Sequence, residues 1–95
     1  MAKQAKMHEL DPKQVGLTLG SFAAVVHIIW VALVGLGFGQ AWYSWITGLH
    51  FLPLSGQVAT FDAGKAVTLV IVAFLIGTAA GILFAKIWNH WLKKL

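Results

Sequence analysis

A few titratable side chains are the residues of this 95-residue chain that could do chemistry, and His27 is the most informative of them. It lies near the middle of the first long apolar run, where a polar side chain is costly and marks a functional position by default. An imidazole there can hydrogen-bond between helices, relay protons near neutral pH, or ligate haem or a metal. Ligation needs a second copy of the chain, because no other histidine lies at that depth. We expect a structural hydrogen bond between helices, with no cofactor and no metal bound.

The other candidates for chemistry have simpler interpretations. Asp62 precedes an apolar run and suits a helix N-cap better than an acid catalyst. Glu9 and Asp11 lie outside the apolar runs and near no paired base. Three further histidines border those runs, where solvated histidines are ordinary: His8, His50 and His90. Cysteine is absent, and no serine-nucleophile, phosphate-loop, dinucleotide, zinc-protease or EF-hand motif occurs, so we predict that the chain is not an enzyme.

The composition of the chain is far more apolar than that of a water-soluble domain. The chain is 59% hydrophobic and 11% charged, whereas soluble domains carry about 25% charged residues. The net charge is +4, and the lysines stand at the ends of the apolar runs. That placement suits anionic lipid headgroups and not a nucleic-acid interface. We therefore predict a membrane protein whose partner is the lipid bilayer, with no nucleic acid bound.

Two apolar runs predict two transmembrane helices. A polar tail of residues 1–10 leads into the first, residues 11–39, where Asp11 is the expected cap and Pro12 suits the first turn. The run that follows carries no charge as far as residue 39 and is long enough to cross a hydrocarbon core of ~30 Å. The predicted fold class is an all-α membrane protein built as an antiparallel hairpin of two transmembrane helices.

The second transmembrane element spans residues 62–95, starts at Asp62 and carries no charge over residues 66–85. Its far end is basic and aromatic, a combination typical of a water boundary. The residues expected to anchor it there are Lys86, Trp88, Trp91, Lys93 and Lys94.

Residues 40–61 form the predicted connection between the spans. Trp42, Tyr43 and Trp45 cluster just past the first apolar run, and amphipathic aromatic side chains settle at the headgroup level. We expect a short interfacial helix over residues 41–51, ended by Pro53.

The lysines also predict the orientation. Three precede the first span and three end the second, whereas the connection holds only Lys65, beside Asp62. Because lysine-rich ends stay on the cytoplasmic side, we expect a multi-pass protein of the cell membrane with both termini in the cytoplasm. The lysines before the first span are Lys3, Lys6 and Lys13.

Small residues at four-residue spacing predict where the helices meet. In lipid, helices associate where small side chains let the backbones approach each other. The second span carries the row Ala73, Gly77, Gly81 and Ala85, and the first carries the row Gly16, Gly20 and Ala24. We expect this face to pack within the hairpin. The alternative is a face for a second copy or a partner protein.

The midpoints of the two apolar runs predict a partner for His27. Aligning residues 17–37 with residues 66–87 sets His27 level with Gly77 and Thr78. We therefore expect a hydrogen bond between His27 and Thr78.

The whole pattern resembles a group of small membrane proteins. The run from Leu10 to Gly20 leads into a tryptophan-bearing span, an aromatic connection follows, and a glycine-rich second span ends in Lys and Trp. This resembles small two-span prokaryotic membrane proteins that are uncharacterised or labelled holin-like, over residues 10–90. The long loop at Pro53 departs from the pattern, and the resemblance assigns no functional residue.

Three functions follow as hypotheses. The first is a non-enzymatic accessory or assembly protein that associates through small-residue helix faces, with a larger membrane complex or as a homo-oligomer. The second is a holin-like or proton-conducting homo-oligomeric pore, with Thr18, His27 and Thr78 along a narrow polar path. The third is a haem- or metal-binding membrane subunit that uses His27 from two copies.

Overall fold

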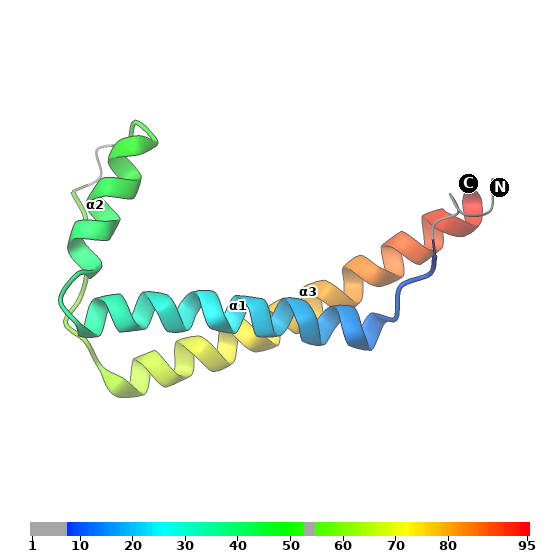
Figure 1. The fold of residues 1–95 in the computed structure, drawn as a ribbon, viewed down its shortest axis with the longest axis horizontal. Helices are drawn as coiled ribbons and strands as arrows, with labels where there is room; N and C mark the ends of the chain where they lie inside the picture. Colours follow the sequence, from blue (N-terminus) through cyan, green and yellow to red (C-terminus); the bar gives the residue numbers. More distant parts are fainter. Residues whose placement is uncertain (1–7, 53–54) are drawn as a thin grey trace.

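The computed structural model describes residues 8–52 and 55–95, which are all-helical apart from turns and loops. Three helices follow one another: α1 (Pro12–Gly35), α2 (Gly39–Leu49) and α3 (Ala63–Lys94). α1 and α3 lie side by side in opposite directions, and α2 turns sharply away from them (Figure 1). The expectations for Lys3, Lys6, the rest of residues 1–7 and Pro53 lie outside the described residues.

The two long helices carry most of the apolar sequence. α1 has 24 residues, α3 has 32, and both are long and apolar enough to cross a membrane. In the most apolar 18-residue stretch of each helix, only 6% of the stretch is buried inside the hairpin. No large side chain in the described residues is fully buried. The all-helical fold class with two long apolar helices is confirmed, and both helices leave most of their apolar surface uncovered within the described residues.

Both long helices begin where their aspartates predict. Asp11 accepts a hydrogen bond from the Lys13 amide at 3.2 Å, and Pro12 occupies the first turn of α1. Asp62 accepts one from the Lys65 amide at 3.1 Å. Each carboxylate thus satisfies one of the amides that have no partner within the helix.

The first helix ends earlier than residue 39, because a glycine turns the chain. Gly37 has φ +91°, a left-handed conformation that glycine adopts without steric cost. Its amide donates to Val34 O at 3.1 Å, and the Phe38 amide donates to Leu33 O at 2.8 Å. This pair of bonds closes a helix in the Schellman manner, so α1 stops at Gly35 and α2 can start at Gly39.

The short helix of the connection covers residues 39–49 and not 41–51. After Leu49 the chain turns at Phe51, which has φ +61°. The Phe51 amide donates to Gly48 O at 3.0 Å, and the Leu52 amide donates to Thr47 O at 2.9 Å. A second Schellman closure therefore ends α2, here with a bulky residue in the left-handed position.

Candidate functional site

The closest approach of α1 and α3 is a contact between glycines. A methyl group placed on Gly81 would lie 2.7 Å from Gly16 Cα and 2.8 Å from Val15 O. One placed on Gly77 would lie 2.9 Å from Gly20 Cα. The two backbones therefore touch directly, and at these positions no residue larger than glycine fits without moving one helix.

The same geometry aims glycine hydrogens at carbonyl groups of the opposite helix. The methyl positions of Gly16 and Gly20 lie 2.9 Å from Thr78 O and 2.8 Å from Phe74 O, respectively. The methyl position of Gly77 lies 2.9 Å from Leu19 O. Contacts between Cα hydrogens and carbonyl oxygens recur at close helix interfaces and add a modest attraction. Backbone atoms therefore take part directly in the closest contacts, and the side chains of Ala23, Thr78 and Ile82 pack beside them.

The alanines of both rows flank this contact. Ala73 and Ala85 are buried, as are Gly16, Gly20 and Gly81. Ala24 and Gly77 are half-buried. The small-residue face is thus packed within the hairpin.

The expected hydrogen bond between His27 and Thr78 is absent. The glycine contact sets Thr78 opposite Gly16 and Gly20, whereas His27 lies seven residues further along α1. At 1.5 Å per residue, this is an axial offset of about 10 Å. His27 Nδ1 instead lies 2.8 Å from Ala23 O of its own helix. The midpoint alignment was wrong because the register follows the glycines, not the centres of the apolar runs.

Thr78 has a different environment from the one expected. Its hydroxyl oxygen is buried between the helices, directly against the Cα of Gly20, and it is the only buried side-chain polar atom without a hydrogen-bond partner in the described residues. It therefore fills the space beside a glycine and does not form an intramembrane polar pair.

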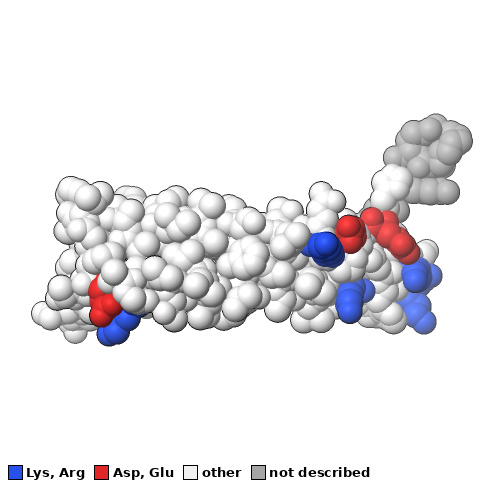
Figure 2. All heavy atoms as spheres, turned by 90° about the horizontal axis from the view of Figure 1, so that it is seen from below, with Lys and Arg blue, Asp and Glu red and all other residues white. Residues whose placement is uncertain are grey.

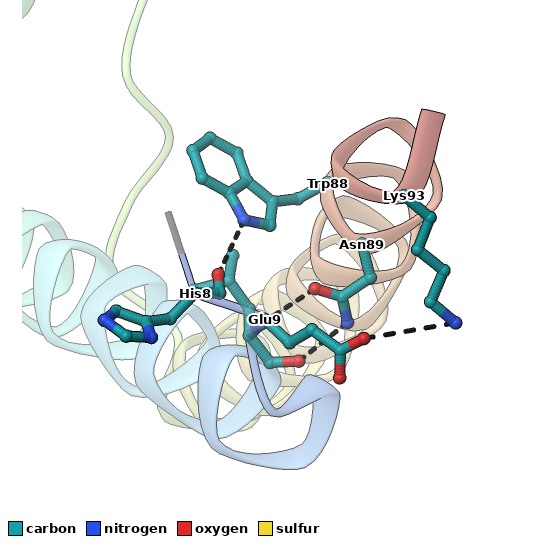
Figure 3. A network of polar contacts seen from close by, with 6 residues as sticks. His8, Glu9, Trp88, Asn89 and Lys93 are labelled. Carbon is teal, nitrogen blue, oxygen red and sulfur yellow. Dashed lines mark hydrogen bonds and ion pairs between the residues drawn. The ribbon is translucent and has the colours of Figure 1, made fainter. Parts of the chain in front are cut away.

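The segment before α1 is held against the far end of α3 by Asn89. The Asn89 side chain accepts from the Leu10 amide through Oδ1 and donates to Leu10 O through Nδ2, both at 2.8 Å. Figure 3 shows the amide reaching from α3 to the extended chain. Sequence reasoning missed Asn89, although it is the only asparagine of the chain and stands among basic and aromatic residues.

Two further contacts join the same segments. The Trp88 indole donates to His8 O at 3.0 Å, and the exposed pair Glu9 and Lys93 approaches to 4.0 Å (Figure 3). Residues 8–10 are therefore bound to α3 over two turns, and we call this set of contacts the terminal clasp.

Replacing Asn89 with aspartate should open the terminal clasp. The carboxylate can still accept from the Leu10 amide, but its second oxygen would face Leu10 O without a hydrogen between them. Loss of the bond and the new repulsion should cost about 1–2 kcal/mol. We expect the Leu10 amide to exchange with solvent roughly tenfold faster, measured by NMR.

His90→Asp is the matched control, because it adds the same charge one residue away on an exposed side chain that makes no hydrogen bond to residues 8–10. Equal exchange rates at Leu10 in both variants would contradict the role of Asn89.

The three aromatic residues of α2 that we expect at the headgroup level lie on two different faces of the helix. Trp42 and Trp45 are exposed, with ring centroids 5.3 Å apart, on a stripe that also holds Phe38 and Leu49. Tyr43 lies on the opposite face, where its hydroxyl sits close to Gly56. The tryptophans and the tyrosine therefore do not form one cluster.

The returning loop covers the polar face of α2. Gln40 accepts from the Val58 amide at 2.7 Å and donates to Gly56 O at 3.3 Å. Thr47 donates to Tyr43 O within the helix at 2.8 Å. The apolar stripe is consequently the free face of α2.

At the basic and aromatic end of α3, one tryptophan packs against other residues, whereas the second tryptophan and the lysines are exposed. Trp88 belongs to the terminal clasp and stacks on Phe84 at 6.5 Å, whereas Trp91 is exposed beside His90. The lysines at this end are exposed: Lys86, Lys93 and Lys94. Elsewhere in the described residues, no three histidine, aspartate or glutamate side chains converge as a metal site would need.

Comparison with protein-family models, with curated proteins and with solved structures found no match.

Proposed function

We propose that this chain is a small integral membrane protein that crosses the bilayer twice and acts without catalysis, through association with other membrane-embedded chains. α1 and α3 are the two spans in this proposal. The connection lies on the outer side, and both termini lie in the cytoplasm.

The observation that carries the proposal is that the middle of the molecule has an exposed apolar surface without charged side chains. Charged side chains gather at the two ends of the molecule and leave the middle free of them (Figure 2). Residues 14–61 and 66–85 contain no Asp, Glu, Lys or Arg. The uncharged stretch of α3 is about 30 Å long at 1.5 Å per residue, which matches a hydrocarbon core. Large apolar side chains such as Phe22 and Ile76 are about two-thirds exposed within it.

The orientation of α2 supports an interfacial connection. α2 projects sideways from the end of the hairpin, so it lies along the membrane plane when α1 and α3 cross the membrane (Figure 1). Its apolar stripe is free, while its polar face is bound to the loop. Tryptophans on such a stripe favour the boundary between headgroups and acyl chains.

Association through a face other than the glycine face is the form of the function that the contacts support best. The glycine face is used within the hairpin, while the outer sides of both helices remain uncovered. A polar pore has less support, since Thr18 is exposed on α1 and Thr78 is buried against Gly20. These two hydroxyls do not share a path with His27.

Single cysteines test the proposed topology without interference, because the chain has none of its own. We expect a membrane-impermeant maleimide to label Gln57→Cys in intact cells and to label His90→Cys only after permeabilisation. Both native side chains are exposed, so accessibility within the protein is matched. Labelling of His90→Cys in intact cells would overturn the orientation, and recovery of the protein in the soluble fraction would overturn the proposal.

A further inference from the structure

A pocket opens between α1, α3 and the returning loop, at the end of the molecule away from the terminal clasp (Figure 1). Its volume is about 340 Å³, within the range of small-ligand sites. Trp30 and Val34 of α1 and Leu69 of α3 line it, and residues 57–61 of the loop complete the lining. The pocket exists because the two helices diverge from the glycine contact toward this end, and the side chains between them do not fill the gap.

The lining of the pocket changes from charged to apolar along α3. Asp62, Lys65 and Leu69 recur at intervals of three and four residues, so they share one face at the start of the helix. The two charged residues lie between the uncharged stretches of the chain, and Leu69 lies about 6 Å further along the helix than Lys65. In the proposed orientation, the charged part therefore lies at the lipid headgroups, and the apolar part lies beside the acyl chains.

The two charges of the lining have opposite signs, and both are open to a ligand. Asp62 Oδ1 accepts from the Lys65 amide at 3.1 Å, and the second carboxylate oxygen accepts no hydrogen bond in the described residues. The Lys65 ammonium is exposed, and the one ion pair within residues 8–52 and 55–95 joins Glu9 to Lys93 instead. A phosphate alone would be repelled by Asp62, and an amine alone would be repelled by Lys65. The lining is therefore complementary to a group that carries both charges.

Trp30 adds a hydrogen-bond donor on the apolar side of the charged pair. Its indole Nε1 can only donate, and no hydrogen bond of the described residues involves it. The nitrogen is not sealed inside the hairpin, since Thr78 Oγ1 is the only buried side-chain polar atom there without a partner. Trp30 lies about 7.5 Å before the end of α1 at Gly35. The ester carbonyls of a phospholipid also lie between the phosphate and the acyl chains, and they can accept from such an indole.

We propose that this pocket binds a phospholipid whose headgroup carries both a phosphate and a primary amine, as in phosphatidylethanolamine. The phosphate pairs with Lys65, the amine donates to Asp62, and an ester carbonyl accepts from Trp30, while part of an acyl chain lies against Val34 and Leu69. A trimethylated amine has no hydrogen to donate, so choline lipids lack the charge-assisted bond to the carboxylate. This inference rests on the proposed membrane insertion and adds a lipid partner of defined chemistry.

Titration of lipids into bicelles tests the pocket. The protein is held in choline-lipid bicelles while phosphatidylethanolamine or phosphatidylglycerol is added, and NMR follows the indole N–H signals of the five tryptophans. Trp30→Phe assigns the Trp30 signal. We expect phosphatidylethanolamine to shift this signal saturably and to leave that of Trp91, exposed at the opposite end, almost unchanged. Phosphatidylglycerol is anionic and has no amine, so it should shift Trp30 less.

Equal responses of Trp30 to the two lipids would overturn the proposed headgroup. Equal responses of Trp30 and Trp91 to phosphatidylethanolamine, or no response of either, would overturn the site.

Two variants separate the roles of the charges. Asp62→Asn keeps the helix cap, because asparagine caps as well as aspartate, but it loses the charge that pairs with the amine. It should bind phosphatidylethanolamine about fivefold more weakly, as an exposed ion pair near the upper end of its usual strength requires. It should also bind phosphatidylglycerol more tightly, because Lys65 then meets the phosphate without a competing carboxylate. Lys65→Gln should weaken binding of both lipids.

Asp11→Asn and Lys94→Gln are the matched controls, because they make the same exchanges at the opposite end of the molecule. Both should leave the titration of Trp30 unchanged, and equal weakening by Asp62→Asn and Asp11→Asn would overturn the pairing of Asp62 with the amine. A protein that resists extraction by alkaline carbonate but shows no preference for the ethanolamine lipid would overturn the lipid site and leave the proposed function intact. A protein released from membranes by alkaline carbonate would instead overturn the proposed function itself.

Discussion

Replacing Gly81 with alanine should destabilise the packing of α1 against α3 by roughly 1–3 kcal/mol, the usual cost of adding a methyl group to a filled contact. The added carbon would lie 2.7 Å from Gly16 Cα and 2.8 Å from Val15 O. Both are backbone atoms, which cannot rotate away as a side chain can. The helices must therefore separate, and the contacts between Cα hydrogens and carbonyls lengthen along with them. The free energy of separation can be measured in bicelles with labels on the two helices.

Gly48→Ala is the control for this experiment. Gly48 is also in a helix, but a methyl group there would meet nothing within 4 Å. Because alanine is the better helix former, this variant should be neutral or slightly more stable. If Gly81→Ala behaved in the same way, the backbone contact could not be the interaction that holds the hairpin.

Replacing Ile76 with lysine should reduce membrane insertion of α3 by a hundredfold or more. Ile76 lies near the centre of the uncharged stretch and is 64% exposed. On a protein surface in water this exchange would change little. At the centre of a bilayer a lysine costs about 2.5–3.5 kcal/mol on the insertion scale, and the favourable isoleucine is lost as well. The inserted fraction, read from a glycosylation tag, measures the effect.

Ile87→Lys provides the matched comparison, since it makes the same exchange in the same helix. Ile87 is 49% exposed and follows Lys86 at the charged end. A lysine there can extend to the headgroups, so insertion should hardly change. Equal tolerance of both lysines would mean that α3 does not cross a membrane.

The elements of the fold were largely accessible from the sequence. Asp11 and Asp62 mark helix starts because a carboxylate before an apolar run satisfies free amides, and both do so in the structure. The ends were harder to place. Gly37 is one of several glycines near the end of α1, and the sequence does not tell which of them takes a positive φ.

The register between α1 and α3 was not accessible from composition. Centring two apolar runs assumes that both helices sit symmetrically in the bilayer. The glycine contacts decide otherwise, since only one alignment brings Gly16 and Gly20 against Gly81 and Gly77. The two rows predict the packing faces, and their contact, rather than the centres of the apolar runs, sets the depth of His27 relative to α3.

Asn89 could not be assigned from the sequence, because its role depends on where the chain before α1 runs. A side-chain amide beside lysines and tryptophans is typical of any membrane–water boundary, so the sequence alone predicts no specific contact for it. Asn89 gains its role only because the chain brings the Leu10 backbone next to it, where the Leu10 amide and carbonyl each form a 2.8 Å hydrogen bond with the Asn89 side chain.

The crossing of α1 and α3 has a mechanical consequence. The helices come closest at the glycines and diverge toward both ends (Figure 1). The terminal clasp bridges one opening, and Phe61 against Gly35 bridges the other. The two end contacts therefore help to hold the angle at which the helices cross, which contact at the glycines alone would leave less constrained.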